Sequence, residues 1–169
     1  MRKYVFVDPS GSFNEGKGHT AIATMLDDDW TSLTTQTVAA KDYTSQFDYW
    51  RGIINAVFDE FITGDVENIV IIESFMIRNN GYLIGKMPET ILFIGALIHQ
   101  LDCVKIKYIF QTPTQAKSRF KDEALSKYIP NFEKRSNGRF YLNGKQTNDH
   151  VRDALKHLLY FKKYGYKKL

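Results

Sequence analysis

The chain has 169 residues, 43% of them hydrophobic and 25% charged, with a net charge of +4. This composition is typical of one globular domain, residues 1–169, and argues against a disordered, collagen-like or multidomain chain. The single cysteine, Cys103, excludes an intramolecular disulfide, and the apolar stretch after Met1-Arg2-Lys3 is too short for a signal peptide, so we expect a cytoplasmic location. The longest apolar run, Ile91–Ile98, is far shorter than the roughly 20 residues of a membrane-spanning helix, so we expect no membrane contact.

The first 40 residues predict three β-strands. Lys3–Asp8 is rich in β-branched and aromatic residues and runs into Asp8-Pro9-Ser10-Gly11, a turn signal. His19–Leu26 and Ser32–Ala40 have the composition of two further strands. Because consecutive strands joined by turns usually pair with each other, these segments predict an antiparallel meander.

Helices and strands alternate in the middle of the chain. Apolar residues recur at helical spacing from Ser45, with a stop at Gly64, and predict an amphipathic helix. Ile69–Ile72 is a continuous β-branched run, typical of a strand buried on both faces. Pro88–Gln100 predicts an almost wholly apolar helix, and Lys105–Phe110 predicts a fifth strand.

The remaining third is basic and less regular. Asp122–Tyr128 has helical character, Arg139–Gln146 predicts a hairpin that turns at Asn143-Gly144, and the segment from about Asp149 to Phe161 predicts a final helix. Together the elements predict an α/β domain with a mixed sheet and helices on both of its faces.

Charges are divided unevenly along the chain. Residues 1–104 contain 7 Lys or Arg and 14 Asp or Glu, whereas residues 105–169 contain 16 and 5. The first part is therefore acidic and the second strongly basic. This division suits a protein that binds a polyanion with one part and keeps acidic groups for another task, although a solubilising basic face would give the same counts.

Asp8 and Glu73 are candidate site residues at the ends of two predicted strands. Asp8 also fits an ordinary turn residue. Glu73 ends the apolar run Ile69–Ile72, where an inward-pointing carboxylate is costly unless it is paired or bound to a cation; the alternative is that it has already reached solvent. In a sheet of this order the first and fourth strands are expected to be neighbours, which would bring the two carboxylates together.

More candidates lie at the start of the last helix. Asp149, His150 and Asp153 are spaced so that they can share one helix face. The helix dipole explains Asp149 and partly Asp153, but it does not explain His150, which is a good metal ligand. If these groups meet Asp8 and Glu73 without a compensating Lys or Arg, they repel one another, and Mg²⁺ or Mn²⁺ would relieve that repulsion.

Four segments, in this order, resemble the RuvC-type Holliday-junction resolvases, and in particular the bacteriophage branch of that family. They are Val7-Asp8-Pro9-Ser10, Ile71-Ile72-Glu73-Ser74-Phe75, Pro113-Thr114-Gln115-Ala116-Lys117 and His150-Val151-Arg152-Asp153-Ala154-Leu155. The segments span nearly the whole chain. The resemblance implies an RNase H-like fold, with three antiparallel strands followed by two parallel strands in a mixed five-stranded sheet, and a homodimer.

The same resemblance implies an activity. Members of the family are endonucleases that hydrolyse phosphodiester bonds at four-way (Holliday) and related branched DNA junctions by two-metal-ion catalysis, with two Mg²⁺ ions per site and Mn²⁺ as a substitute. The four metal-binding catalytic positions fall here on Asp8, Glu73, His150 and Asp153. Asp149 is an alternative to His150, and Lys117 matches the basic active-site residue. No organic cofactor is expected, and the location would be the host cytoplasm if the protein is phage-encoded.

Two groups of residues are candidates for DNA contacts. After the glutamate the family carries an apolar or aromatic side chain that enters the junction centre, and basic residues in the later half would bind phosphates. The candidates are Phe75, Met76, Arg78, Lys117, Arg119 and Lys121. The last three would share one side of an extended segment. The alternatives are that Phe75 packs under its loop and that the basic residues form a solvated face.

Two other functions are compatible with parts of the sequence. Asp8 to Ser12, after a β-strand, also resembles a phosphate loop of the actin and sugar-kinase type, which normally needs two such domains. A non-catalytic DNA-binding module would use only the basic second half and would leave the acidic residues unexplained. We therefore predict a metal-dependent junction endonuclease.

Overall fold

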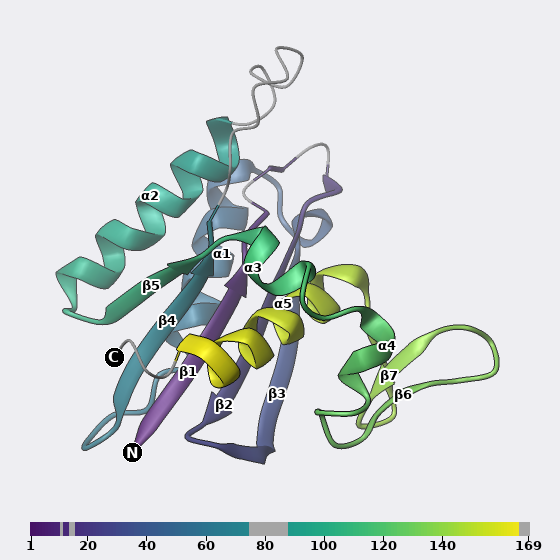
Figure 1. Ribbon diagram of the computed structural model, residues 1–169. Coiled ribbons are helices and arrows are strands. Elements are labelled where there is room, and N and C mark those ends of the chain that lie inside the picture. The colour runs from purple at the N-terminus through teal and green to yellow at the C-terminus, as the bar shows by residue number, and fades with distance from the viewer. Residues whose placement is uncertain (11, 14–15, 75–87, 166–169) are drawn as a thin grey trace.

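The computed structural model describes residues 1–10, 12–13, 16–74 and 88–165 (Figure 1). Its centre is a five-stranded sheet in the order β3-β2-β1-β4-β5. The strands are β1 (Arg2–Asp8), β2 (His19–Leu26), β3 (Asp29–Ala39), β4 (Glu67–Glu73) and β5 (Lys107–Gln111). Within the described ranges, no helix is long and apolar enough to cross a membrane.

Strand pairing confirms the predicted mixed sheet. β1 pairs antiparallel with β2, and β2 with β3, so the first three strands form the expected meander. β4 then pairs parallel with β1, and β5 pairs parallel with β4. The first and fourth strands are therefore neighbours, and their carboxyl ends lie at the same edge of the sheet.

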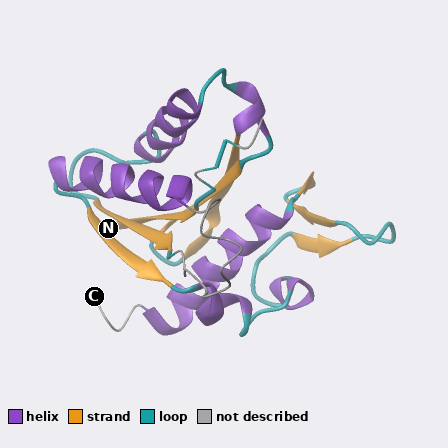
Figure 2. Ribbon diagram, turned by 90° about the horizontal axis from the view of Figure 1, so that it is seen from above, coloured by secondary structure: helices purple, strands orange, loops and turns teal. Residues whose placement is uncertain are grey.

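Helices cover both faces of this sheet (Figure 2). α1 (Gln46–Phe58) and α2 (Pro88–Cys103) pack on one face, and α5 (Asp149–Tyr160) packs on the other. α1 begins after Ser45, whose hydroxyl accepts a hydrogen bond from the backbone N–H of Asp48. The three long helices predicted from the sequence are confirmed, although α1 ends earlier and α2 later than their patterns indicate.

The sheet separates two apolar cores. Alternate residues of a strand point to opposite faces, so Val5 and Val7 of β1 pack toward α1 and α2, whereas Tyr4 and Phe6 pack toward α5. All four side chains are fully buried. The same alternation turns Asp8, the last residue of β1, toward α5.

A second, three-stranded sheet lies in the basic part of the chain. It consists of β6 (Phe132–Lys134), β7 (Phe140–Leu142) and β8 (Lys145–Gln146). β7 and β8 form the predicted hairpin, and Asn143 and Gly144 at its turn both have positive φ, 50° and 79°, as a tight two-residue turn requires. The sequence pattern predicts neither β6 nor α3 (Pro113–Lys117), and the predicted helix after Asp122 is limited to α4 (Asp122–Leu125).

Candidate active site

Two carboxylates end neighbouring strands on the α5 face of the sheet. Asp8 closes β1 and Glu73 closes β4, and the two residues are only 7% and 8% exposed. Phe6 lies two residues before Asp8, and Ile71 lies two residues before Glu73; both belong to the core on the α5 side. Because side chains alternate along a strand, Asp8 and Glu73 point to that same face. Glu73 is thus a buried carboxylate and has not reached solvent.

α5 brings a histidine to Asp8. The helix begins after Asn148, whose side-chain oxygen accepts a hydrogen bond from the backbone N–H of Val151 at 2.8 Å. In its first turn, Nδ1 of His150 lies 3.1 Å from Oδ2 of Asp8. The hydrogen bond with Asp8 is the main reason that the pKa of His150 is raised.

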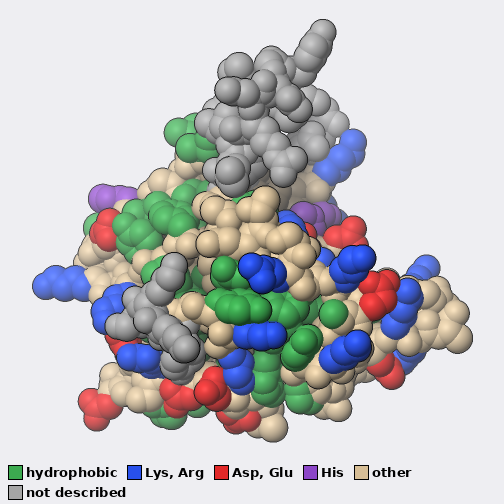
Figure 3. Space-filling model, viewed as in Figure 1, with side chains coloured by type: hydrophobic (Ala, Val, Ile, Leu, Met, Phe, Trp, Pro, Cys, Tyr) green, Lys and Arg blue, Asp and Glu red, His purple; other side chains and the backbone are tan. Residues whose placement is uncertain are grey.

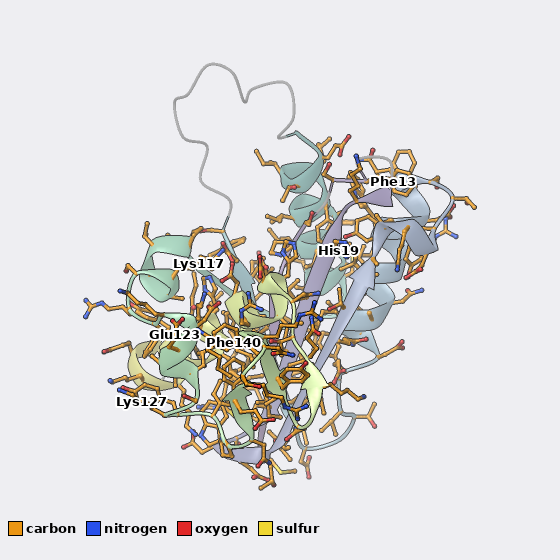
Figure 4. All side chains as sticks on the ribbon, turned by 90° about the vertical axis from the view of Figure 1, so that its right-hand side faces the viewer. Phe13, His19, Lys117, Glu123, Lys127 and Phe140 are labelled. Atoms are coloured by element: carbon orange, nitrogen blue, oxygen red, sulfur yellow. The ribbon has the colours of Figure 1, made fainter. Side chains whose placement is uncertain are left out.

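Lys117 lies between two other carboxylates. Its Nζ is 3.0 Å from Oε1 of Glu73 and 2.9 Å from Oδ2 of Asp153, the next site residue on α5. Lys156 approaches the other oxygen of Asp153 at 2.9 Å. The condition under which the acidic residues would repel one another, the absence of a compensating basic residue, is therefore not met, because the unforeseen helix α3 carries Lys117 to this end of the sheet (Figure 4).

The two strand-end carboxylates differ in their ease of ionisation. Burial raises the pKa of Asp8, and the charge of Glu73 adds to this increase, although the hydrogen bond with His150 opposes it. Burial also acts to raise the pKa of Glu73, but His157 and Lys117 outweigh it and lower that pKa to about 2. Burial disfavours the charge on Lys117, but Asp153, Glu73 and Asp8 outweigh this effect and raise its pKa.

A buried histidine that sequence reasoning missed supports Glu73. His157 of α5 is fully buried, with Nε2 3.1 Å from Oε2 of Glu73 and Nδ1 3.0 Å from the side-chain oxygen of Gln111 at the end of β5. Nε2 and Oε2 are within ion-pair distance, although neither atom has a hydrogen-bond partner among the described residues. A signal was present in the sequence, because His157 lies four residues after Asp153 and hence on the same helix face.

Asp149 is directed away from this cluster. Its side chain is 87% exposed and pairs with Arg152, which also contacts Asp122 at 2.6 Å. Of the two candidates for the fourth position, only His150 contacts Asp8. The geometry therefore favours His150, the residue that the motif register selects.

The predicted DNA contacts are placed only in part. Phe75, Met76 and Arg78 lie outside the described residues. Lys117, Arg119 and Lys121 do not lie along one side of an extended segment, because Lys117 ends a helix and faces Glu73, whereas the Arg119 guanidinium lies 5.7 Å from the centre of the Tyr164 ring. Lys121 is exposed just before α4. The prediction that these three basic residues share one side of an extended segment is therefore wrong.

The donor groups at this site suit a hard divalent cation. Mg²⁺ prefers carboxylate oxygens, and Asp8 is a buried carboxylate without an ion-paired lysine or arginine among the described residues. In the same part of the chain, no three His, Cys, Asp or Glu side chains form a ready-made metal cluster. Lys117 instead holds the position between Glu73 and Asp153. The carboxylates are thus of the type that binds Mg²⁺, and Lys117 lies between two of them, Glu73 and Asp153.

Comparison with known proteins identifies the fold. No protein-family model and no curated protein matches the sequence. Among solved structures, the chain is similar to T. thermophilus RuvC in complex with Holliday junction substrate, with a TM-score of 0.68 and 13% sequence identity over 99% of this chain and 97% of that chain.

This likeness covers both chains almost completely. The strand order β3-β2-β1-β4-β5, with helices on both faces, is the RNase H-like fold, as in RuvC. The fold class predicted from the sequence is confirmed.

Proposed function

We propose that this protein is a metal-dependent endonuclease that cuts four-way and related branched DNA junctions. The observation that carries the proposal is the convergence of Asp8, Glu73, His150 and Asp153 around Lys117 at one end of an RNase H-like sheet. The similar RuvC structure holds a Holliday junction substrate, which supports branched DNA as the substrate class. The basic second half of the chain supports a polyanionic partner.

Asp8, Glu73, Asp153 and His150 would hold Mg²⁺, and we propose two ions per site with Mn²⁺ as a substitute. When bound, the ions would polarise the scissile phosphate and the attacking water. Asp8 is the central ligand in this proposal because its buried carboxylate meets His150 on one side and the charge of Glu73 on the other. His157 contacts Glu73 from the interior of the protein, where its ring is fully buried.

Lys117 has two roles in the proposed mechanism. In the described structure it neutralises Glu73 and Asp153, which keeps these carboxylates from repelling each other. With the carboxylates neutralised by bound metal, Lys117 would be available to stabilise negative charge on the scissile phosphate. His150 would bind metal or orient water, while its Nδ1 contacts Asp8.

A twofold dimer would present two such sites to a symmetric junction and explain paired cuts. α2 exposes Ile91 and Leu92, 40% and 60% accessible, and Figure 3 shows hydrophobic side chains over the part of this view where α2 and β5 lie. We propose α2 as the dimer interface. Sedimentation of the wild type and Leu92→Glu tests this, since a dimer that persists in the variant would exclude α2.

The function is tested by incubating the protein and Mg²⁺ with linear, flap and four-way DNA of matched sequence. We expect cleavage of the four-way junction, with 5′-phosphate and 3′-hydroxyl ends, and little cleavage of the linear duplex. Asp8→Asn is the control for contaminating nucleases. Junction binding without cleavage would favour a non-catalytic DNA-binding module, and nucleotide hydrolysis without cleavage would favour the actin and sugar-kinase type.

A further inference from the structure

A groove of about 540 Å³ adjoins the candidate active site. It is lined by residues of the small sheet, by the start of α5 and by His19 at the beginning of β2. The lining residues are His19, Gly138, Arg139, Phe140, Gln146, Thr147, Asn148, Asp149, His150 and Arg152. His150 also contacts Asp8, so the groove continues directly from the candidate site. Figure 4 shows His19 and Phe140 on the side of the molecule that carries this groove.

The groove has an excess of positive and hydrogen-bonding groups. Its only acidic lining residue is Asp149, which is already paired with Arg152. Arg139 is exposed, donates one hydrogen bond to the side-chain oxygen of Gln146 at 3.1 Å, and has no ion pair within the described ranges. An exposed guanidinium without an acidic partner is suited to bind a phosphate.

His19 is a second unused polar group in the groove. Its Nδ1 is buried and has no hydrogen-bond partner in the part of the chain that the structure describes. The ring lies 6.1 Å from that of His150, centre to centre. A Cβ at Gly18, the preceding residue, would collide with the carbonyl oxygen of Ser12, so the loop before His19 packs tightly against the backbone after β1. His19 is therefore held next to the site, and its Nδ1 is unpaired as far as the described residues go.

The small sheet lines part of the groove and packs against α5. The Phe140 ring is stacked against Phe132 at 5.7 Å and lies 5.1 Å from the Arg152 guanidinium of α5, which ties the sheet to the helix. The connection between β6 and β7 projects from the body of the molecule (Figures 1 and 2). Arg139 lies where this projection returns to β7.

We propose that this groove binds the phosphodiester backbone of the DNA strand that runs away from the candidate cleavage site, with Arg139 contacting a phosphate and His19 lining the opposite wall. The inference rests on the proposed function of the adjacent site. Most of the lining residues carry polar side chains, Arg139 adds a guanidinium without an ion pair among the described residues, and the groove joins the site where a phosphodiester would react.

Arg139→Gln tests the proposal, with Arg51→Gln as the matched control. Arg51 is exposed on α1, on the opposite side of the sheet. Binding of a labelled four-way junction is measured over a salt series without divalent metal. We expect Arg139→Gln to weaken binding about 5- to 10-fold at low salt and to reduce the slope of log K against log salt by about 0.9, while Arg51→Gln changes neither and Arg139→Lys keeps the slope.

A second measurement locates the contact. Each phosphate near the junction is replaced in turn by a neutral methylphosphonate. In the wild type, one or two positions should weaken binding, and these positions should have no further effect in Arg139→Gln. Equal slopes for Arg139→Gln and the wild type, or no position whose effect depends on Arg139, would overturn the proposal. These assays measure binding and need no cleavage. An inactive wild type would therefore refute the proposed function, whereas the binding results would still decide whether the groove contacts DNA.

Discussion

The two faces of the central sheet differ most at the carboxyl ends of β1 and β4. On the face covered by α1 and α2, the last inward residues are Val7 and Ile72, which are fully buried in an apolar core. On the α5 face, the next residues along the same strands are Asp8 and Glu73. One step along each strand thus changes the environment from a mainly apolar core to a cluster of charges.

This difference shows how one sheet serves two purposes. The α5 face is also apolar along most of its length, with Tyr4 and Phe6 packed against residues of α5 such as Leu155. Its charged strand-end residues meet the first turns of α5, which supply His150 and Asp153, and the buried His157 lies between this polar end and the apolar part. The apolar part of this face packs beneath the polar end, whereas the candidate site residues are absent from the core that Val7 and Ile72 share. Substitutions on the two faces should therefore have different consequences.

The largest expected effect is the loss of cleavage on neutralising the charged end of the α5 face. Asp8→Asn, Glu73→Gln and Asp153→Asn should each reduce Mg²⁺-dependent cleavage by more than about 100-fold, while junction binding stays equal or becomes tighter because phosphate repulsion falls. Val7→Ala, on the other face, should cost about 1–3 kcal/mol of stability and leave cleavage of the folded protein unchanged. Near-normal cleavage by any carboxylate variant would remove that residue from the site.

A smaller effect is expected for the buried support of Glu73. His157→Leu should raise the Mg²⁺ concentration needed for half-maximal cleavage by about 10- to 100-fold, because Glu73 loses the group that orients it. His157→Gln should recover part of this loss. Leu158→Ala on the same helix should destabilise the fold by about 2–5 kcal/mol without altering the metal requirement. An unchanged metal requirement in His157→Leu would show that His157 only fills the core.

Thermal unfolding without divalent metal should separate the two strand-end carboxylates. The pKa of Glu73 falls on folding from 4.5 to about 2, so its charge stabilises the fold above pH 4.5, and this stabilisation disappears as the pH falls toward 2. The pKa of Asp8 is raised on folding, so its charge is a penalty at neutral pH and is absent at low pH. At pH 7, Glu73→Gln should melt below the wild type and Asp8→Asn above it, by at least 2–4 °C if each change is about 1 kcal/mol or more.

Both differences in melting temperature should shrink in acid, where the wild-type carboxyls are protonated as well. A destabilised Asp8→Asn at pH 7 would contradict the assignment of Asp8 as a buried, unfavourable charge.

The smallest expected effect concerns Asp149, which adjoins the site in sequence but not in space. Asp149→Asn should lose only its contribution at the helix start, about 0.3–1 kcal/mol of stability, and should keep cleavage activity. His150→Ala should strongly reduce activity, and His150→Asp should recover much of it because both side chains bind divalent metal. An inactive Asp149→Asn beside an active His150→Ala would reverse the assignment of the fourth ligand.

The sequence alone determined the central sheet, the long helices and the positions of Asp8, Glu73, His150 and Asp153 on them. These features follow from local periodicity, because strand alternation and helical spacing decide which side chains share a face. The pairing of the first and fourth strands also followed, since few topologies fit this order of elements. The bounds of the hairpin at Asn143-Gly144 could be predicted because so few residues adopt positive φ at low cost.

Only the tertiary structure decided which groups neutralise the carboxylates. Lys117, at the end of the short helix α3, pairs with Glu73 and Asp153. His157 of α5 contacts Glu73 with one ring nitrogen and Gln111 with the other. These contacts join segments far apart in the chain, and a short helix such as α3 has too few turns to leave a periodic signal. The pKa directions of Asp8 and Glu73 depend on burial and on these distant charges. For that physical reason two similar strand-end carboxylates, indistinguishable by local pattern, acquire opposite pKa shifts in the folded protein.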